Sequence, residues 1–214
     1  MGLPSSVPEA VDLALTGSEV RPLDAIRIAV GEDDMLMIQS AAFGLPAEVA
    51  RRYDRWRQSL CFRLVGRVLG KQIYRLLALA GLRREKRRAH QGGLRLRVEF
   101  AGEQISANAL ALFIGNEATL GGDFVPCPQA RTDDGKLDFC LVSHDAETDY
   151  LDLFRDVARG EHLNRDMVSY RQGSSPLRLE FESAASIMVD GDVWRSAAVF
   201  EFEVLAGRFS VVVS

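Results

Sequence analysis

The feature that most constrains the fold is a change in the spacing of apolar residues at Gly92-Gly93. From Leu60 to Leu82, before this point, apolar side chains recur every three or four residues, which is the spacing of one helical face. From Leu94 onward, most segments alternate apolar and polar residues, which is typical of strands with one buried face. The sequence therefore predicts a mainly β domain of the α+β class, a sandwich or open barrel with a few inserted helices.

The individual elements follow from the same patterns. The length of 214 residues supports one large domain or two small ones with a real core. Short helices are expected at 8–16 (ended by Gly17), after Pro46, and at 147–160 with Thr148 as its cap, and the pattern from 60 to 82 is helical. Strands are expected at 20–30, 35–43, 94–100, 105–116, 136–142, 176–182, 185–191, 198–205 and 208–214.

Composition excludes several classes of function. The net charge of -4 argues against a nucleic-acid binder, which is normally strongly basic. The three cysteines (Cys61, Cys127 and Cys140) have no CxxC pair and no ligand-like spacing to histidine, so a structural zinc site is not expected. No apolar run is long enough to span a bilayer, and the start has no secretion signal. These features favour a cytoplasmic protein whose thiols are buried as small hydrophobic groups.

Three loops combine glycine with carboxylate residues, at 114–124, 128–142 and 188–194. In the second and third loops an Asp-Gly pair between apolar segments is a strong hairpin signal, so a plain turn is the first interpretation. Hard cations, however, take carboxylate and carbonyl oxygens from a single tight loop, so Asp133-Asp134-Gly135 is also a candidate ion site. In the third loop, the alternative to a plain turn is that Asp192 reaches into a cleft as a general base.

Two basic runs interrupt the first half, at 51–57 and 83–88. Such runs are usually the solvated face of a helix. Because Trp56 lies within the first run, contact with an anionic membrane surface is the alternative.

The order and spacing of these segments resemble the C-terminal domain of the diacylglycerol kinase family, which includes bacterial soluble lipid kinases, sphingosine kinases and ceramide kinases. The resemblance rests on "FGLPAEVAR", on "IGNEATLGGDFVPCPQARTDDGKLDF", on "GEHL" and on "VDGDVW", and it covers nearly the whole chain. It implies a β-sandwich domain over 1–214 with a helical insertion at about 46–90. It also implies an N-terminal nucleotide-binding domain with a GGDGT-type motif, which is absent from this sequence.

The resemblance assigns expected roles to residues. Asp134, with the backbone carbonyls of Arg131 and Lys136, would form a magnesium site, while Asp133 and Asp138 would cap the turn and face solvent. Asp192 would be the catalytic base, at a position where the family usually has glutamate. The cleft that takes the substrate would include Asn116, Gly121, Gly122 and Asp190. The third glycine of the family's usual GGG is Asp123 here, and both departures imply a changed substrate or weak activity.

The activity that the resemblance implies is transfer of the γ-phosphate of ATP to a lipid hydroxyl at the membrane surface, with Mg²⁺ as cofactor. The isolated chain would be inactive without its N-terminal nucleotide-binding domain, and a homodimer is a further candidate assembly. The apolar segment 60–82 would shelter an acyl chain or simply pack on the sandwich. Two other interpretations stay open: a stand-alone lipid- or metabolite-binding module, and a structural β-domain with an incidental metal loop.

Overall fold

The computed structural model describes residues 6–57, 80–81, 93–121, 124–144 and 150–213. Three α-helices are described, α1 (Val7–Thr16), α2 (Leu45–Arg57) and α5 (Tyr150–Arg159), together with the short 3-10 helix η1 (His162–Asn164). The strands are β1 (Glu19–Val30), β2 (Asp33–Met37), β3 (Ser40–Gly44), β4 (Leu94–Phe100), β5 (Glu103–Gly115), β6 (Leu137–Ser143), β7 (Val168–Gly173), β8 (Leu177–Val189) and β9 (Asp192–Val213).

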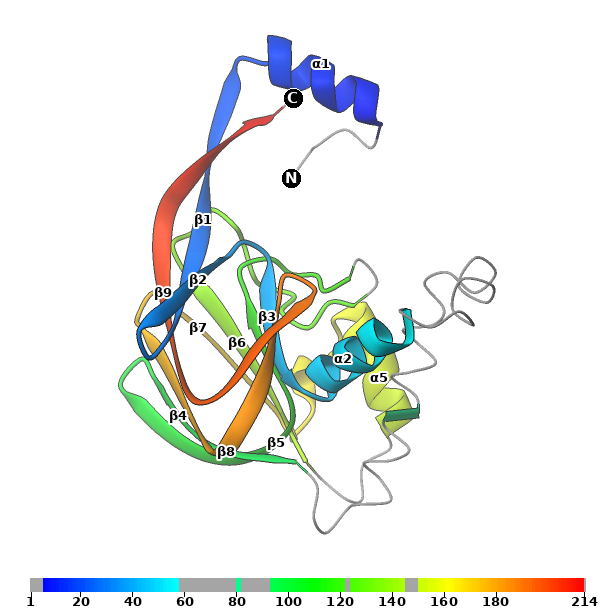
Figure 1. The fold of residues 1–214 in the computed structure, drawn as a ribbon, viewed down its shortest axis with the longest axis vertical. Coiled ribbons are helices and arrows are strands. Elements are labelled where there is room, and N and C mark those ends of the chain that lie inside the picture. Colours follow the sequence, from blue (N-terminus) through cyan, green and yellow to red (C-terminus); the bar gives the residue numbers. More distant parts are fainter. Residues whose placement is uncertain (1–5, 58–79, 82–92, 122–123, 145–149, 214) are drawn as a thin grey trace.

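The strands form one antiparallel sheet in the order β2-β1-β9-β8-β3-β5-β6-β7. β4 also pairs with both β5 and β8, so β3 and β4 lie end to end in the same row between these two long strands. The sheet curls so that its inner face encloses the core, as the ribbon in Figure 1 shows. The predicted mainly β, sandwich-like fold with few helices is therefore confirmed.

Two apolar clusters hold this sheet together. The inner cluster is built from alternate residues of nearly all strands. It includes four almost fully buried phenylalanines, Phe43, Phe139, Phe200 and Phe202. The second cluster lies on the other side of β3, β5 and β6, where Leu153 and Val157 of α5 and Ala47 and Ala50 of α2 cover it. The central strands are thus buried on both faces, which explains why β5 and β6 read as continuous apolar runs rather than alternating ones.

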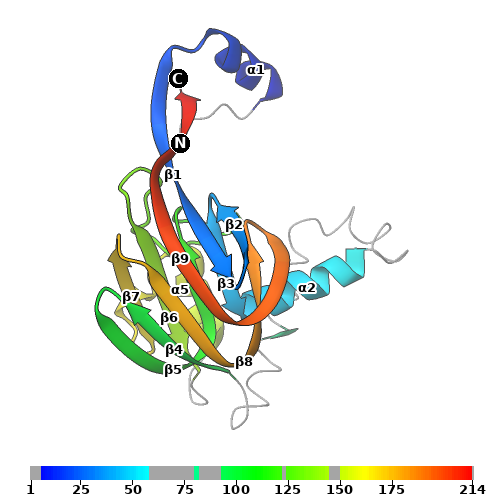
Figure 2. The ribbon, with the colours of Figure 1, turned by 60° about the vertical axis from the view of Figure 1, so that its left-hand side comes forward.

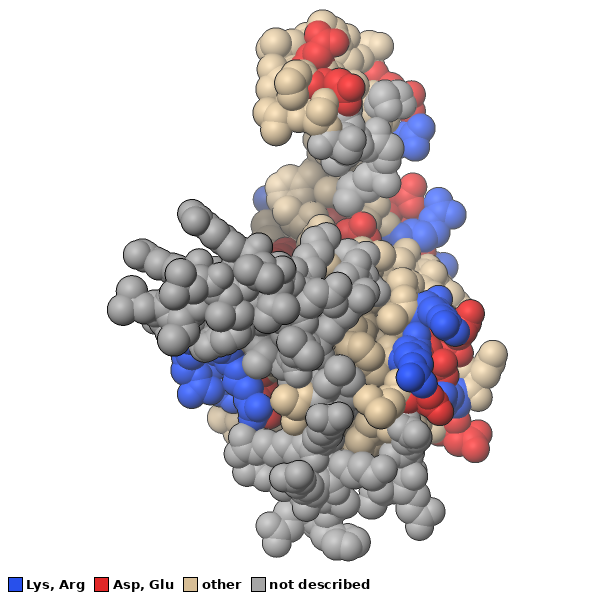
Figure 3. Space-filling model, turned by 90° about the vertical axis from the view of Figure 1, so that its right-hand side faces the viewer, with Lys and Arg blue, Asp and Glu red and all other residues tan. Residues whose placement is uncertain are grey.

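At one end of the molecule, β1 and β9 continue beyond the sandwich as a two-stranded ribbon (Figures 1 and 2). The ribbon pairs Glu19 with Val213 at its tip and Leu23 with Phe209 at its base, and it carries α1. None of the side chains of α1 is buried. The projecting part at the top of Figure 3 shows mainly uncharged side chains, together with some Asp and Glu side chains.

Several expected strand boundaries are wrong, and each has a physical reason. The segments 176–182 and 185–191 form the single strand β8, and 198–205 and 208–214 merge into β9. The polar and glycine residues between them mark register shifts, at 180–185 of β8 and opposite 23–25 of β1. Extra residues at such an irregularity bend a strand without ending it, so one long strand can pair with two neighbours.

Two further differences concern shorter elements. The expected strand 35–43 is two strands, because the chain turns at Ile38-Gln39 between β2 and β3. β7 was not predicted, since "VSYRQG" is an edge strand with few apolar residues. Most of the expected insertion at 46–90, the Thr148 cap and Asp123 lie outside the described residues. No helix in the described part of the chain is long and apolar enough to cross a membrane.

Candidate functional site

The backbone of Gln39, at the break between β2 and β3, connects two of the three glycine-carboxylate loops, 114–124 and 188–194, through hydrogen bonds. Its N–H donates to Asp190 Oδ1 at 2.8 Å, and its carbonyl accepts from the N–H groups of Asn116 at 2.9 Å and Glu117 at 3.0 Å. The carboxylate of Asp190 also accepts from the N–H groups of Ile38 and Ser40. The loops that follow β5 and β8 are therefore fixed to the same three-residue segment.

The Asp190-Gly191 pair is the hairpin turn that the sequence predicts. Val189 pairs with Asp192 across it, and both turn residues have positive φ, 48° for Asp190 and 98° for Gly191. Such values belong to the type of turn that matches the twist of a hairpin, and they favour Asp-Gly. Asp192, the expected base, is exposed at the first position of β9, and its carboxylate makes no hydrogen bond to the described residues. Its carboxylate is therefore accessible to solvent.

A buried carboxylate, Asp24, ties the second loop, 128–142, to the first loop, 114–124. Asp24 is 2% exposed and sits on β1 where the β1–β9 ribbon leaves the sandwich. Its two oxygens accept from the N–H groups of Gly135 and Gly207, each at 2.7 Å. Its own N–H donates to the carbonyl of Thr132 at 2.7 Å, and its carbonyl accepts from Nδ2 of Asn116 at 2.9 Å. The Asp-Gly turn at 134–135 is thereby held against the base of the ribbon.

The side chains of the turn make only local contacts. Asp134 is half-buried and accepts the N–H of Lys136 with Oδ1 at 3.1 Å, which leaves Oδ2 without a partner in the described structure. Arg131 contacts Asp133 rather than Asp134, with Nε to Oδ1 at 3.2 Å, and this hydrogen bond raises the pKa of the Arg131 guanidinium. Gly135, with φ of 68°, allows the tight backbone. A carboxylate with two backbone carbonyls is a donor set that a hard cation such as Mg²⁺ accepts.

A metal centre made of side chains alone is a different matter. Within the described ranges, no group of three or more His, Cys, Asp or Glu residues is arranged to hold an ion. The expected magnesium ligands are one carboxylate and two backbone carbonyls, which is a different type of site. That site stays a prediction.

The remaining expected cleft residues occupy different environments. Asn116 is fully buried, and its Nδ2 also donates to the carbonyl of Ile38 at 2.7 Å, so it bridges β1 and the β2–β3 break. Its Oδ1 is buried without a hydrogen bond in the described part of the protein. Gly121 is exposed in a turn with φ of 65°, and Gly122 lies outside the described residues. The backbone of Gly115 lies close to the side chain of Cys127, since an added Cβ would lie 2.7 Å from the Cys127 Cβ.

Asp138 corrects one expectation about the same loop. It was expected to face solvent, but it is 0% exposed on β6, where it accepts from the Tyr170 hydroxyl and from Nε2 of Gln172. Burial raises the pKa of the Asp138 carboxyl, and the two donors partly oppose this effect. Asp133 does face solvent, as expected.

The buried thiols lie beside this carboxylate. Cys127 and Cys140 are free and fully buried, as the sequence predicts, and burial raises the pKa of Cys140 to about 12. Next to them His162 is fully buried, with Nε2 at 3.1 Å from the carbonyl oxygen of Pro126. Because a carbonyl only accepts, Nε2 carries the proton. These groups pack the loop that precedes the Asp-Gly turn onto α5 and β6.

Sequence reasoning missed Asp24 because it is one polar residue in an apolar strand. The feature that could have indicated its role is its position in the buried segment Leu23 to Ile26, since a carboxylate inside an apolar segment requires hydrogen-bond donors. The same reasoning applies to Asp138 in "LDFCLV".

The comparisons with known proteins agree with this fold. Three solved structures described as diacylglycerol kinases or putative diacylglycerol kinases, all from Bacillus anthracis str. Sterne, match over 100% of the chain, with TM-scores of 0.68, 0.66 and 0.64 at 20%, 19% and 16% identity. The chain covers 61–64% of their length. Curated proteins named diacylglycerol kinase, from Mycobacterium tuberculosis strains CDC 1551 / Oshkosh and ATCC 25618 / H37Rv, are 36% identical over 67 residues, which is 31% of this chain and 22% of theirs.

Fold and matches together define the class of this protein, a β-sandwich-like C-terminal domain of the diacylglycerol kinase-like family. The family described as the YegS C-terminal NAD kinase β-sandwich-like domain matches residues 40–213, and the chain belongs to it. The chain thus spans less than two thirds of the relatives that it resembles.

Proposed function

We propose that this chain is the substrate-side domain of an ATP-dependent lipid kinase, and that it acts with a nucleotide-binding domain. The observation that carries the proposal is the joining of the three glycine-carboxylate loops at the ribbon end of the sandwich, through Gln39 and Asp24, in a chain of this family. A catalytic cleft needs its groups held in one place by a rigid scaffold, and these loops have that support.

The proposed reaction is phosphoryl transfer, in which the protein chiefly positions the reactants and stabilises charge. The lipid hydroxyl oxygen forms a bond to the γ-phosphorus of ATP, the bond from that phosphorus to the bridging oxygen breaks, and ADP leaves. Asp192 accepts the hydroxyl proton, a role that suits an exposed carboxylate without an internal partner. Aspartate reaches about 1–1.5 Å less far than glutamate, and a misplacement of that size costs on the order of 10²-fold in rate.

Magnesium, when bound at Asp134 and the carbonyls of Arg131 and Lys136, supplies a positive charge that neutralises the turn. Asp24 orients that turn through the Gly135 N–H, and Asp134 orients the Lys136 N–H. In this proposal, these two hydrogen bonds would keep the turn in the shape that binds the ion.

The test is the full-length protein with labelled ATP and a panel of lipids with free hydroxyl groups. We expect Mg²⁺-dependent phosphorylation that falls by at least about 10²-fold in Asp192→Asn. The matched control is Asp34→Asn, which removes an exposed carboxylate from β2 and should keep the parent rate. A parent rate in Asp192→Asn would remove Asp192 as the base, and unchanged Mg²⁺-dependent stability in Asp134→Ala would remove the metal site.

The second candidate is a stand-alone lipid- or metabolite-binding module without kinase activity. The coding sequence upstream discriminates between the two, because a GGDGT-type segment in the same reading frame supports the kinase. Peripheral binding to membranes and a homodimer remain predictions of the kinase proposal, and vesicle sedimentation and light scattering of the full-length protein test them.

A further inference from the structure

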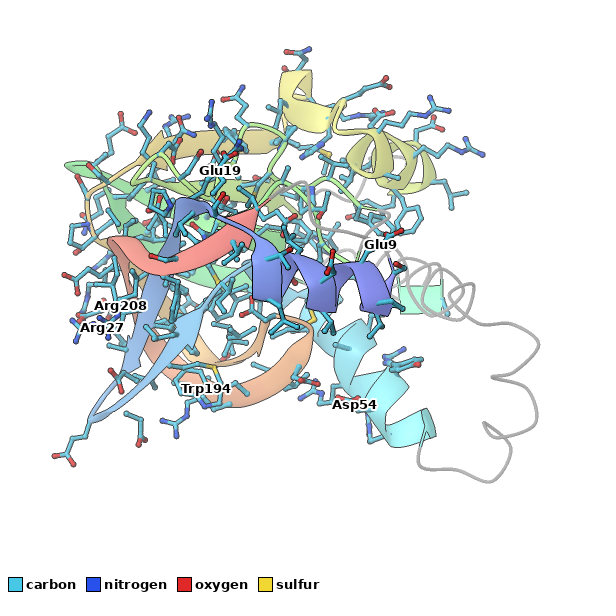
Figure 4. The ribbon with its side chains drawn as sticks, turned by 90° about the horizontal axis from the view of Figure 1, so that it is seen from above. Glu9, Glu19, Arg27, Asp54, Trp194 and Arg208 are labelled. Carbon is cyan, nitrogen blue, oxygen red and sulfur yellow. The ribbon has the colours of Figure 1, made fainter. Side chains whose placement is uncertain are left out.

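A β-bulge near the start of β9 sets the direction of a positive side chain close to the proposed base. Val193 of β9 pairs with Met188 of β8. Two residues later, Arg195 pairs with Ile187, the immediate neighbour of Met188. Trp194, which is labelled in Figure 4, is therefore an extra residue without a partner on β8. Such a bulge re-aims the side chains beside it, and bulges are common next to active sites.

The bulge places Arg195 on the same face of the sheet as Asp192. Residues directly opposite one another in an antiparallel pair point to the same side. Asp192 pairs with Val189, a residue of the inner apolar cluster, and Arg195 pairs with Ile187 of the same cluster. In a regular strand, positions 192 and 195 would point to opposite faces. Because their partners are two residues apart on β8, the two charged residues stand about 7 Å apart along the strand.

Two neighbours hold the Arg195 guanidinium in place. Its Nη1 donates to Oδ2 of Asp33, the first residue of β2, at 2.6 Å. Its Cζ lies 4.7 Å from the centroid of the Trp194 ring, and this ring packs against the inner cluster. The hydrogen bond to Asp33 thus links the β8–β9 hairpin, which carries Asp192, to the β1–β2 hairpin.

Most of the hydrogen-bonding capacity of this guanidinium is unused. Arginine has five N–H donors, and Arg195 makes no hydrogen bond other than the one to Asp33 in the described structure. The Arg195 side chain is 33% exposed and the Asp33 side chain is 65% exposed. An exposed ion pair adds little stability, so a second anion can share or replace Asp33 as the partner. A phosphate fits this role, because a guanidinium binds it through two parallel N–H groups.

The separation of the two charged residues suits phosphoryl transfer. A hydroxyl oxygen in position to react lies about 2.6–3.2 Å from its base and about 3–3.5 Å from the atom it attacks. The γ-phosphorus is then up to about 6–7 Å from the Asp192 carboxylate, on the same scale as the separation from Arg195. The transferred group spreads negative charge over its equatorial oxygens, and an arginine that contacts them stabilises the transition state.

We propose that Arg195 binds the γ-phosphoryl group of ATP and is a second catalytic residue of the site. The inference rests on the proposed function for the identity of the nucleotide. Without nucleotide, Asp33 keeps the guanidinium on the face of Asp192. With nucleotide, the unused N–H groups bind the phosphoryl oxygens, so Asp33 is a positioning residue that competes for the same cation.

Nucleotide binding to the full-length protein, without a lipid acceptor, tests the contact. The probes are ADP and the non-hydrolysable ATP analogue with an imido bridge between the β- and γ-phosphorus, each with Mg²⁺, and calorimetry measures both affinities. Arg195→Ala should weaken the analogue by about tenfold to a hundredfold, the range for a hydrogen bond to a charged group, and leave ADP unchanged. Arg195→Lys should keep part of this affinity, because the charge stays and the fork of donors is lost.

Asp33→Asn separates this role from a purely structural one. If the ion pair only stabilises the fold, Asp33→Asn and Arg195→Ala should weaken the analogue alike. If Arg195 binds the phosphoryl group, Asp33→Asn removes a competitor and the analogue should bind as tightly as in the parent, or more tightly. The matched control is Arg27→Ala, which breaks a similar pair with Glu203 on the outer face of the sheet and should leave both affinities unchanged.

The outcomes distinguish this inference from the proposed function. Parent-like affinity for the analogue in Arg195→Ala overturns the inference, and so does an equal loss in Asp33→Asn. With a lipid acceptor, kcat of Arg195→Ala should fall by about 10²–10³-fold, and a parent rate overturns the inference alone. Binding of the analogue through Arg195 in a protein that phosphorylates no lipid overturns only the lipid kinase function. No binding of the analogue by the parent overturns both.

Discussion

Asp24 joins three segments that lie far apart in the sequence, since its carboxylate and its backbone bind Gly135, Gly207, Thr132 and Asn116. A buried carboxylate is stable only when donors surround it, so the fold depends on this set of bonds. No local pattern in the sequence specifies these partners. Asp24 therefore illustrates why the loops of the site could be identified from the sequence while their attachment could not.

We predict that Asp24→Asn lowers the free energy of unfolding by about 2–4 kcal/mol, because one backbone N–H loses a charged acceptor and the new amide N–H₂ faces another donor. Urea denaturation measures this loss. Hydrogen exchange at the amides of Gly135 and Gly207 should become faster, while the amides of β5 keep their relative order of protection. Unchanged exchange at both glycines would contradict the role of Asp24 as their acceptor.

His162 gives a prediction with a defined direction in pH. Burial lowers the pKa of His162 below its ordinary value of 6.5, so the unfolded chain takes up this proton first as the pH falls. Its contribution to stability is therefore complete above about pH 6.5 and is lost below it, with a slope of at most about 1.4 kcal/mol per pH unit. In His162→Gln, unfolding measured at pH 8, 6 and 5 should show a smaller loss between pH 8 and pH 5 than the parent. An equal loss would contradict this assignment.

At the scale of elements, the long strands explain which sequence signals were reliable. Asp190-Gly191 was correctly identified as a turn, because its φ values fit the two residues of a hairpin. The break between β2 and β3 has no such local signal, since it depends on the Asp190 carboxylate, about 150 residues away. The bulges at 180–185 of β8 and opposite 23–25 of β1 carry glycine or small residues that look like turns in sequence. The position of the β2–β3 break and the continuity of β8 and β9 depend on tertiary contacts, which a local sequence pattern does not contain.

The β2–β3 break can be tested through Asp190. Asp190→Ala removes the acceptor of three backbone N–H groups and places alanine at positive φ, so we expect a loss of about 2 kcal/mol. Asp190→Asn tolerates the same φ and keeps one acceptor, so its loss should be about half as large. Asp192→Asn should stay within about 0.5 kcal/mol of the parent, because this side chain is exposed and makes no bond in the described structure. Equal losses in all three variants, measured in urea, would contradict the role of Asp190 at the break.

At the scale of the whole molecule, α1 is the part whose sequence pattern and surroundings disagree. Its apolar residues Val7, Val11 and Leu15 recur every four residues and are 76%, 53% and 80% exposed. A helix of this length is marginal without packing on one face. Under the proposed function, the nucleotide-binding domain would be the partner of this face.

This arrangement predicts different effects in two forms of the protein. Leu15→Gln should change the stability of the 214-residue chain by less than about 0.5 kcal/mol, because the side chain is exposed there. In the full-length protein the same variant should lose about 1.5–3 kcal/mol, the value of burying a leucine side chain. Glu9→Gln on the same helix is the control and should be neutral in both forms. Thermal unfolding of the two forms measures the difference, and equal effects would contradict docking through α1.

The pairing of Glu19 with Val213 has a consequence for protein engineering. Paired residues in an antiparallel sheet have Cα atoms about 4.5–5.5 Å apart, so the first residue of β1 and the last residue of β9 lie next to each other. A circular permutant that joins these strand ends by a short glycine linker and opens the exposed Gly31-Glu32 turn should keep the sandwich intact. The same geometry allows the domain to be inserted into a surface loop of another protein without stretching either one.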